Sequence, residues 1–315
     1  MQASADPGRL PLDELLRVSE QLLAEAGIAS ARYDAEVLIA HVLDAERSAL
    51  ATWIVMGSHI DAAAAGRVTA LVERRADREP LQHIVGRAPF RRIELAVGPG
   101  VFVPRPETEL VAQAAINELE SQLVEAVGPL LVVDLCSGSG ALALSIAYEV
   151  PRTVVHAVEL SGDAVLWLQR NVDELDLKAR VTVHHDDAAS APIGLDGEVD
   201  VIVCNPPYVP DGAAIRDPEV VAFDPSVALW GGPDGLDVVR SVVANAEAML
   251  RAGGLLLVEH ADVQGEALPE LLRGRTTTAG PLWTDVADHT DLNGLPRFTS
   301  ARRSRVLPTH AKVRA

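Results

Sequence analysis

The sequence has few cysteines, no long hydrophobic run and a shortage of basic residues. Two Cys among 315 residues cannot form the disulfide framework of a small secreted protein. No apolar run approaches the roughly 20 residues of a transmembrane helix, and the first ten residues contain no signal-peptide core. Hydrophobic residues make up 48% and charged residues 23%, which excludes a disordered or fibrous chain. We therefore expect a cytoplasmic globular protein of about two domains.

The charge of the chain is strongly negative and unevenly distributed. Lys and Arg number 27 against 45 Asp and Glu, a net charge of −18, which repels phosphate and argues against direct nucleic-acid binding. The last 19 residues nevertheless contain six bases and no acid: Arg297, Arg302, Arg303, Arg305, Lys312 and Arg314. We interpret this segment as a solvated, frayed terminus, with contact to an acidic or RNA-rich partner as the alternative.

The hydrophobic pattern changes twice along the chain. Residues 1–80 predict a helical bundle, with helices beginning near Leu12, spanning 33–43 and beginning after Asp61. Residues 81–105 predict a β-hairpin linker, with β-type runs at 82–86, 93–97 and 101–103. Residues 106–315 form the third region, in which apolar strands and helices alternate from Leu130 onward. This alternation predicts an α/β fold with a parallel, doubly wound sheet covered on both faces.

A loop of small residues follows the first strand of the alternating region. Small residues let the backbone approach a ligand closely and leave amide groups free at the start of the next helix. Glu159 ends the next strand, 21 residues after Gly138, where an acid can bind a ribose hydroxyl pair. Asp187 follows the third strand and suits the adenine side. The loop reads Cys-Ser-Gly-Ser-Gly-Ala over residues 136–141, where the dinucleotide fingerprint requires G-x-G-x-x-G, so we interpret it as favouring a nucleoside ligand over NAD; the alternative is a tight turn that binds nothing.

The most specific motif is Asn205-Pro206-Pro207-Tyr208, directly after a buried strand. The two prolines fix φ and lack N–H groups, so the loop is stiff. The Asn205 side-chain oxygen and the Pro206 carbonyl can both accept from one planar –NH2 group, on which Tyr208 can stack. Two acceptors can align the lone pair of such a nitrogen with an activated methyl group, which is catalysis by positioning. The alternative is a loop punctuator without chemistry.

Together these residues resemble the class I methyltransferases that use S-adenosylmethionine, which have a Rossmann-like, mostly parallel seven-stranded sheet. Over nearly its whole length the chain is similar to the bacterial release-factor glutamine methyltransferases (the PrmC/HemK family). The additional motifs that carry this resemblance are residues 79–86, 104–109, 229–236, 258–260 and 264–266. The resemblance implies methylation of the glutamine amide in the Gly-Gly-Gln motif of class 1 peptide-chain release factors, with a helical domain that binds the partner.

The resemblance also implies roles for single residues. Asn205, Pro206, Pro207 and Tyr208 would hold the glutamine amide, and Phe102, Arg105 and Glu107 would line the site. The cofactor, which leaves as S-adenosylhomocysteine, would contact Asp134, Cys136, Ser137, Gly138, Ser139, Gly140, Glu159, Asp187, Ala188 and Asn205. The family usually has Gly where Cys136 stands and often a large aromatic residue where Ala188 stands. We expect no metal, no membrane contact and a monomer.

Three other functions fit parts of the pattern. An adenine-amino DNA or RNA methyltransferase would use the same Asn-Pro-Pro-Tyr motif, but the acidic chain lacks an inserted recognition domain. A different protein glutamine is a second alternative, and a non-catalytic adaptor that binds a release factor is a third. Separately, Cys136 and Cys204 end strands that would be neighbours in such a sheet, so we expect that the two thiols can approach each other.

Overall fold

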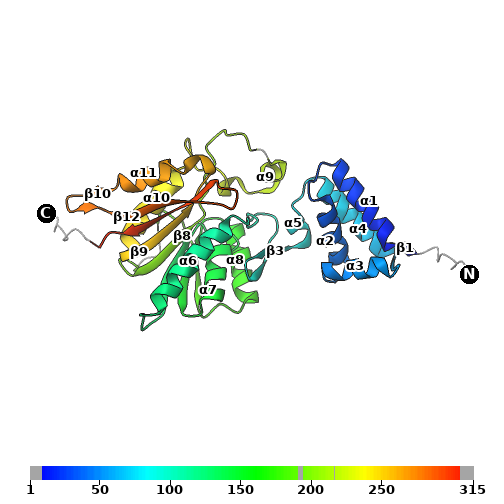
Figure 1. The fold of residues 1–315 in the computed structure, drawn as a ribbon, viewed down its shortest axis with the longest axis horizontal. Coiled ribbons are helices and arrows are strands. Elements are labelled where there is room, and N and C mark those ends of the chain that lie inside the picture. Colours follow the sequence, from blue (N-terminus) through cyan, green and yellow to red (C-terminus); the bar gives the residue numbers. More distant parts are fainter. Residues whose placement is uncertain (1–8, 191–193, 216, 306–315) are drawn as a thin grey trace, which may run out of the picture. The chain divides into compact units, whose positions relative to one another are not determined.

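The computed structural model describes residues 9–190, 194–215 and 217–305. The chain forms two compact units (Figure 1). The first ends at Gly86 and also includes Ile215–Phe223. The second begins at Arg87, runs to Ala214 and resumes at Asp224.

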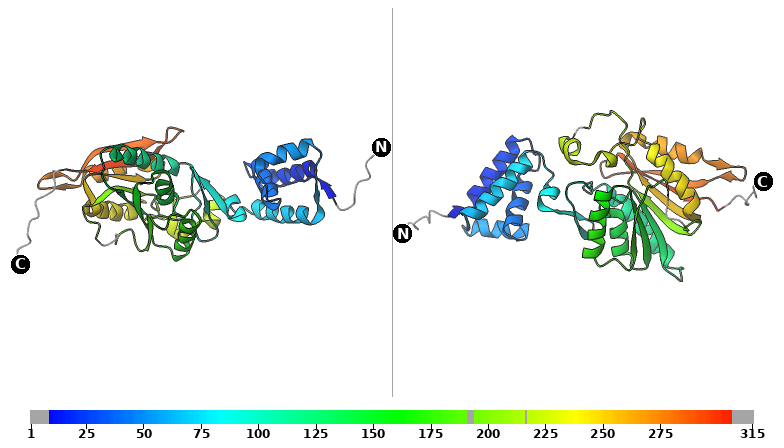
Figure 2. Two further views of the ribbon diagram at one scale, coloured as in Figure 1. Left: turned by 90° about the horizontal axis from the view of Figure 1, so that it is seen from below. Right: turned by 180° about the vertical axis from the view of Figure 1, so that it is seen from behind.

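The first unit is a helical bundle, visible from two further sides in Figure 2. Its elements are β1 (Arg9–Pro11), α1 (Leu12–Glu25), α2 (Ala31–Val42), α3 (Arg47–Val55), β2 (His59–Asp61), α4 (Ala62–Ala76), α5 (Leu81–Val85) and, from later in the chain, α9 (Pro218–Phe223). The buried Arg75 joins these parts, because its guanidinium lies 2.7 Å from Asp34 and 2.8 Å from Glu219 on α9. The core consists of the apolar faces of α1, α2 and α4.

The predicted helices of this unit are present, with one omission and one error. Asp61 begins α4 as expected, since its side chain accepts a hydrogen bond from the Ala64 N–H at 2.8 Å. The helix α3 was not predicted. The β-type assignment of residues 82–86 is wrong, because Leu81–Val85 is a helical turn that ends at Gly86 with φ 74°. A single turn is too short to display a helical period, and its Ile and Val content resembles that of a strand.

The second unit is built on a seven-stranded sheet. The strands of the whole unit, of which β3–β4 and β10–β11 form separate two-stranded sheets, are β3 (Arg87–Phe90), β4 (Ile93–Ala96), β5 (Leu130–Leu135), β6 (Thr153–Glu159), β7 (Val181–His185), β8 (Val199–Cys204), β9 (Leu250–Glu259), β10 (Thr276–Thr277), β11 (Gly280–Pro281), β12 (Trp283–Thr290) and β13 (Pro296–Arg303). Its helices are α6 (Thr108–Leu123), α7 (Ala141–Glu149), α8 (Gly162–Glu174), α10 (Asp237–Met249) and α11 (Ala267–Arg273), with 3-10 turns at Ser226–Ala228 and Asp262–Gln264.

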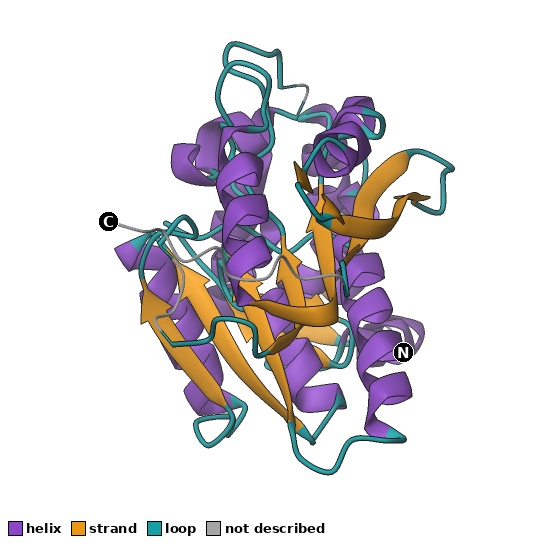
Figure 3. Ribbon diagram, turned by 90° about the vertical axis from the view of Figure 1, so that its left-hand side faces the viewer, coloured by secondary structure: helices purple, strands orange, loops and turns teal. Residues whose placement is uncertain are grey.

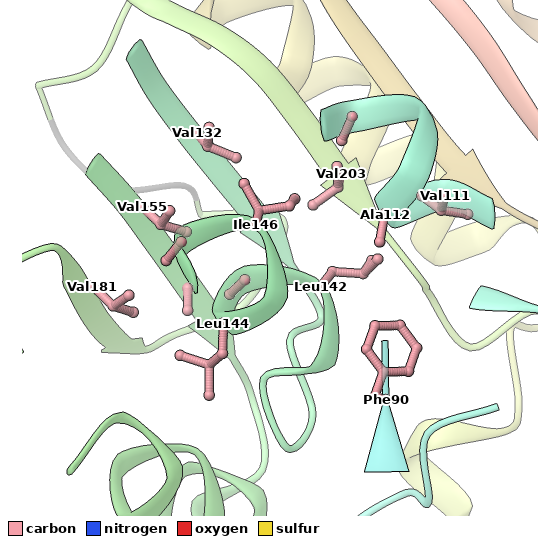
Figure 4. Packing of buried hydrophobic residues seen from close by; sticks show 14 of the residues in the cluster. Phe90, Val111, Ala112, Val132, Leu142, Leu144, Ile146, Val155, Val181 and Val203 are labelled. Carbon is pink, nitrogen blue, oxygen red and sulfur yellow. The ribbon is translucent and has the colours of Figure 1, made fainter. Parts of the chain in front are cut away.

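The sheet has the order β12-β13-β9-β8-β5-β6-β7, with β9 to β7 parallel and β13 antiparallel. Helices cover both faces (Figure 3). Residues alternate along β8, so that Val201 and Val203 face α6, α7 and α8, whereas Ile202 and Cys204 face α10 and α11. Figure 4 shows the first of these cores, into which Phe90 of the β3–β4 hairpin also packs. The predicted fold class is confirmed.

Two further expectations are wrong in this unit. Residues 101–103 pair with no strand in the described part of the chain, although Val101 and Val103 are buried there as a strand pattern would have them. The described part of the segment that begins at Arg297 is not frayed, because β13 pairs with both β9 and β12. Arg302 forms an ion pair with Glu118 at 2.6 Å, and Arg303 is buried. Lys312 and Arg314 lie outside the described residues.

Within the described ranges, no helix is long and apolar enough to cross a membrane.

Candidate active site

The candidate residues lie at one edge of the sheet because they follow the carboxyl ends of adjacent parallel strands. Leu135, the last residue of β5, is paired with Val158 of β6 and Cys204 of β8, and Cys204 is paired with Val258 of β9. In the order of the sheet, the edge therefore presents Glu259, Asn205, Cys136 and Glu159. The family resemblance assigned the last three of these to one cofactor site.

The loop after β5 turns sharply before α7 begins. Cys136 has φ 64°, and Gly138 and Gly140 also have positive φ. The left-handed region is unfavourable for a residue with a β-carbon, which explains why the family resemblance expects Gly at the position of Cys136. A β-carbon at Gly138 would meet no atom within 4 Å, so the space beside the loop is open there.

Buried polar atoms of this loop lack partners among the described residues. Asp134 accepts from the Ala143 N–H at 3.0 Å through Oδ2, but its Oδ1 has no hydrogen-bond partner, and neither does the Ser139 hydroxyl. Burial raises the pKa of Asp134 to about 8, with a further contribution from the charge of Glu159. A ligand with a cationic amino group could donate a hydrogen bond to Asp134 Oδ1, and its charge would favour the ionised form of this carboxyl group. The loop therefore fits the methionine end of S-adenosylmethionine.

Glu159 is bound to the same loop. Its Oε2 accepts from the Gly138 N–H at 2.8 Å and its Oε1 from the Ser161 N–H at 2.7 Å. Each oxygen keeps a second lone pair, which a ribose hydroxyl could use. Asp187 is exposed just after β7, next to the end of β6. Ala188 is buried against the core under α10, where its carbonyl accepts from Asn245, so its methyl group belongs to the core.

The loop after β8, Asn205–Tyr208, is called the reactive loop. It packs against a segment with two glycines, where a side chain would not fit. The Val209 N–H donates to the Leu229 carbonyl and the Gly231 N–H donates to the Val209 carbonyl, each at 2.9 Å. A β-carbon on Gly231 would lie 2.5 Å from the Pro207 oxygen, and one on Gly235 would lie 2.2 Å from the Tyr208 oxygen. Residues 229–236 therefore pack against Asn205–Tyr208 and support it. The sequence had placed them in a family motif without assigning a role.

Two site residues were not assigned from the sequence. The Asn205 side-chain Nδ2 donates to the Thr108 hydroxyl at 3.1 Å, and the Tyr208 hydroxyl donates to Glu259 Oε1 at 3.4 Å. Burial raises the pKa of Glu259 to about 7, against the lowering effects of the Thr108 hydrogen bond and the Arg297 charge. Burial and the Glu259 charge together raise the pKa of Tyr208. The sequence signal for Glu259 was its place at the end of a strand.

The three predicted wall residues are close to these groups. The Arg105 guanidinium lies 4.9 Å from the centre of the Phe102 ring and 2.8 Å from Asp224. The charge of Arg105 lowers the pKa of Tyr208, and that of Glu107 raises the pKa of Glu259. Both charges therefore lie near the reactive loop. The expected approach of the two cysteines is also confirmed, because Leu135, the residue before Cys136, is paired with Cys204, and Cys136 adds to the effect of burial in raising the Cys204 pKa.

No cluster of three or more His, Cys, Asp or Glu side chains suited to a metal ion occurs in the part of the chain that the structure covers.

Comparison with known proteins shows the family of the chain. Residues 14–86 match the family model of the PrmC N-terminal domain, and residues 96–219 match that of the methyltransferase small domain. The release factor glutamine methyltransferase of Streptomyces coelicolor is 48% identical over 90% of this chain and 95% of its own length. The Mycolicibacterium smegmatis protein of that name is 43% identical over 89% and 94%.

Solved structures are more distant. The ribosomal protein L11 methylase of Lactobacillus delbrueckii is 15% identical, with a TM-score of 0.43 over 66% of this chain and 84% of its own. The assignment rests instead on the sequence relatives, which extend over both units. The chain belongs to the release factor glutamine methyltransferase family.

Proposed function

We propose that the protein transfers a methyl group from S-adenosylmethionine to the side-chain amide nitrogen of the glutamine in the Gly-Gly-Gln motif of class 1 peptide-chain release factors. The observation that carries the proposal is the placement of Asn205 and Glu159 on either side of the loop after β5, at one edge of the sheet. This placement would bring a nucleoside site and an amide site side by side.

The Asn205–Tyr208 loop would hold the substrate amide by its two hydrogens. The Asn205 Oδ1 and the Pro206 carbonyl each accept one N–H, and the Tyr208 ring lies against the amide plane. Held in this way, the amide nitrogen directs its lone pair toward the methyl group, and the resulting gain is one of positioning. The nitrogen becomes more acidic as it is alkylated and then releases one proton to water, so the step needs no strong general base.

The cofactor supplies the activated methyl group when it is bound. We propose that the loop residues Cys136, Ser137, Gly138, Ser139 and Gly140 hold its methionine end, with the free Oδ1 of Asp134 facing the amino group. Glu159 would bind the ribose. Asp187 would lie at the adenine, and at Ala188 the backbone would contribute rather than the buried methyl group.

The substrate side is proposed in less detail. Phe102, Arg105 and Glu107 would line the entrance for the glutamine, with the Arg105 cation stacked on the Phe102 ring. The helical unit would contact a part of the release factor away from its Gly-Gly-Gln tip. The net charge of −18 supports recognition of a protein and not of nucleic acid. Such an activity would operate in the cytoplasm, without a metal.

Replacement of Asn205 by Ala tests the proposal. Without one of the two acceptors the amide is no longer aligned, so turnover should fall by at least about 100-fold. Cofactor affinity, measured by calorimetry, should stay within about twofold, since positioning of the amide is what the variant removes. Asn117→Ala, at an exposed position on α6, is the matched control and should retain full turnover. Normal turnover of the Asn205→Ala variant would contradict the proposed mechanism.

A further inference from the structure

The direction in which the Asn205 carboxamide points is critical for the proposed chemistry. A carboxamide has an acceptor, Oδ1, and a donor group, Nδ2, of nearly the same shape. Only Oδ1 can accept a hydrogen from the –NH2 group of the substrate, whereas Nδ2 in its place would bring two donors together. A group in the protein must therefore distinguish the two ends of this side chain.

Thr108 is the group that contacts the Asn205 amide. It is the first residue of α6, is 3% exposed, and its Oγ1 lies 3.1 Å from Asn205 Nδ2. A hydroxyl group can act as a donor or as an acceptor, so Thr108 alone would not fix which end of Asn205 it receives. The orientation of the Asn205 amide is fixed only if the Thr108 hydroxyl donates its single proton to another acceptor.

Glu259 provides that destination. The Thr108 hydroxyl interacts with the neighbouring Glu259 carboxyl group, whose pKa it lowers and which is 1% exposed. An ionised carboxylate only accepts hydrogen bonds, so the Thr108 proton is directed to Glu259 and its oxygen is left to accept from Asn205. Asn205 must then present Nδ2 to Thr108, and its Oδ1 faces away from this contact. The same carboxylate accepts from the Tyr208 hydroxyl at 3.4 Å.

We propose that Thr108 and Glu259 are positioning residues, which set the orientation of the Asn205 amide so that its oxygen is available to the substrate. The proposal rests on the proposed function, because it assumes that Asn205 accepts from the glutamine amide. One buried carboxylate thereby holds both polar side chains of the reactive loop: Tyr208 directly and Asn205 through Thr108.

Charged and titratable groups surround this carboxylate from several elements. They are Arg297 on β13, Tyr208 in the reactive loop, Glu107 before α6 and Cys204 on β8. Arg297 favours the ionised form of Glu259, on which the orientation of Thr108 and Asn205 depends, and Glu107 opposes that form. Arg297 is itself paired with Asp291 at 3.1 Å, so it is held beside the site rather than free to leave it.

The test compares Thr108→Val with Thr108→Ser. Valine has the shape of threonine without the hydroxyl, so we expect kcat to fall by about 30- to 100-fold. The KM for the release factor and the dissociation constant of S-adenosylmethionine should change by no more than about twofold, since neither binding surface is altered. Serine retains the hydroxyl and should restore kcat to within about threefold of the wild type.

A control separates positioning from loss of stability. Thr153→Val removes a buried hydroxyl that donates to the Val150 carbonyl at 2.8 Å, but Thr153 is at the opposite end of β6 from the site. This variant should lower the melting temperature and leave kcat unchanged. If Thr108→Val turns over like the wild type, or if Thr108→Ser is as slow as Thr108→Val, the inference is wrong.

The proposed function and the inference fail in different ways. If the wild-type protein does not methylate a release factor, or if Asn205→Ala retains turnover, the proposed function is wrong. If the wild type is active, Asn205→Ala is inactive and Thr108→Val is fully active, only the positioning role of Thr108 is refuted.

Discussion

Gly231 offers a direct test of how the reactive loop is supported. A β-carbon at this position would lie 2.5 Å from the Pro207 carbonyl oxygen and 2.7 Å from the Gly235 carbonyl oxygen. Ordinary contact begins at 3.4 Å, against 2.5 Å here, so in Gly231→Ala these backbone segments must separate by about 0.9 Å. The effect is steric, because Gly231 does not have a positive φ.

The displacement acts on the residues that would hold the substrate amide. A misplacement of about 1 Å can lower the rate by about 100-fold, which corresponds to roughly 2.7 kcal/mol in the activation free energy. We expect this loss in kcat, measured by transfer of labelled methyl groups, with the affinity for S-adenosylmethionine nearly unchanged.

Gly128→Ala is the matched control, since a β-carbon there meets no atom within 4 Å and φ is not positive. If the kcat of Gly231→Ala lies within threefold of that of Gly128→Ala, the reasoning about loop support is refuted.

Two further predictions concern buried charges. Because burial raises the pKa of Glu259 to about 7, the carboxylate is protonated as the pH falls through that value, and kcat at saturating cofactor should fall about tenfold per pH unit below it. Glu259→Gln can still accept from the Thr hydroxyl but cannot titrate, so it should lose this acidic limb; an unchanged limb would assign the titration to another group. In the helical unit, Asp34→Asn leaves the buried Arg75 with Glu219 as its one charged partner among the described residues, which should cost about 3 kcal/mol of unfolding free energy in urea. Glu20→Gln breaks an exposed ion pair and should cost less than about 1 kcal/mol; equal losses would contradict the role of burial.

The sequence was sufficient for the features that depend on the ends of strands. The apolar runs that end at Leu135, Glu159 and Cys204 predicted a parallel sheet, and such a sheet brings the residues after these runs to one edge. Together with the strand order that the family resemblance implies, this pattern predicted that the loop after β5, Glu159 and Asn205 lie close together.

The contacts across that edge could not be predicted in the same way. Thr108 and Asn205 are separated by 97 residues, and their contact depends on the packing of α6, a helix that the sequence pattern did not reveal. The arginines of β13 were misjudged for a related reason. Their composition resembles that of a solvated tail, but antiparallel pairing with β9 gives Arg302 a carboxylate partner on α6.

The central claim is tested most directly by a methyl-transfer assay with labelled S-adenosylmethionine. A purified class 1 release factor, its Gly-Gly-Gln→Gly-Gly-Ala variant and duplex DNA are offered in parallel, and the modified residue is located by mass spectrometry. We predict label on the wild-type factor alone, on the glutamine side chain. Label on the DNA, or equal label on both forms of the factor, would contradict the account.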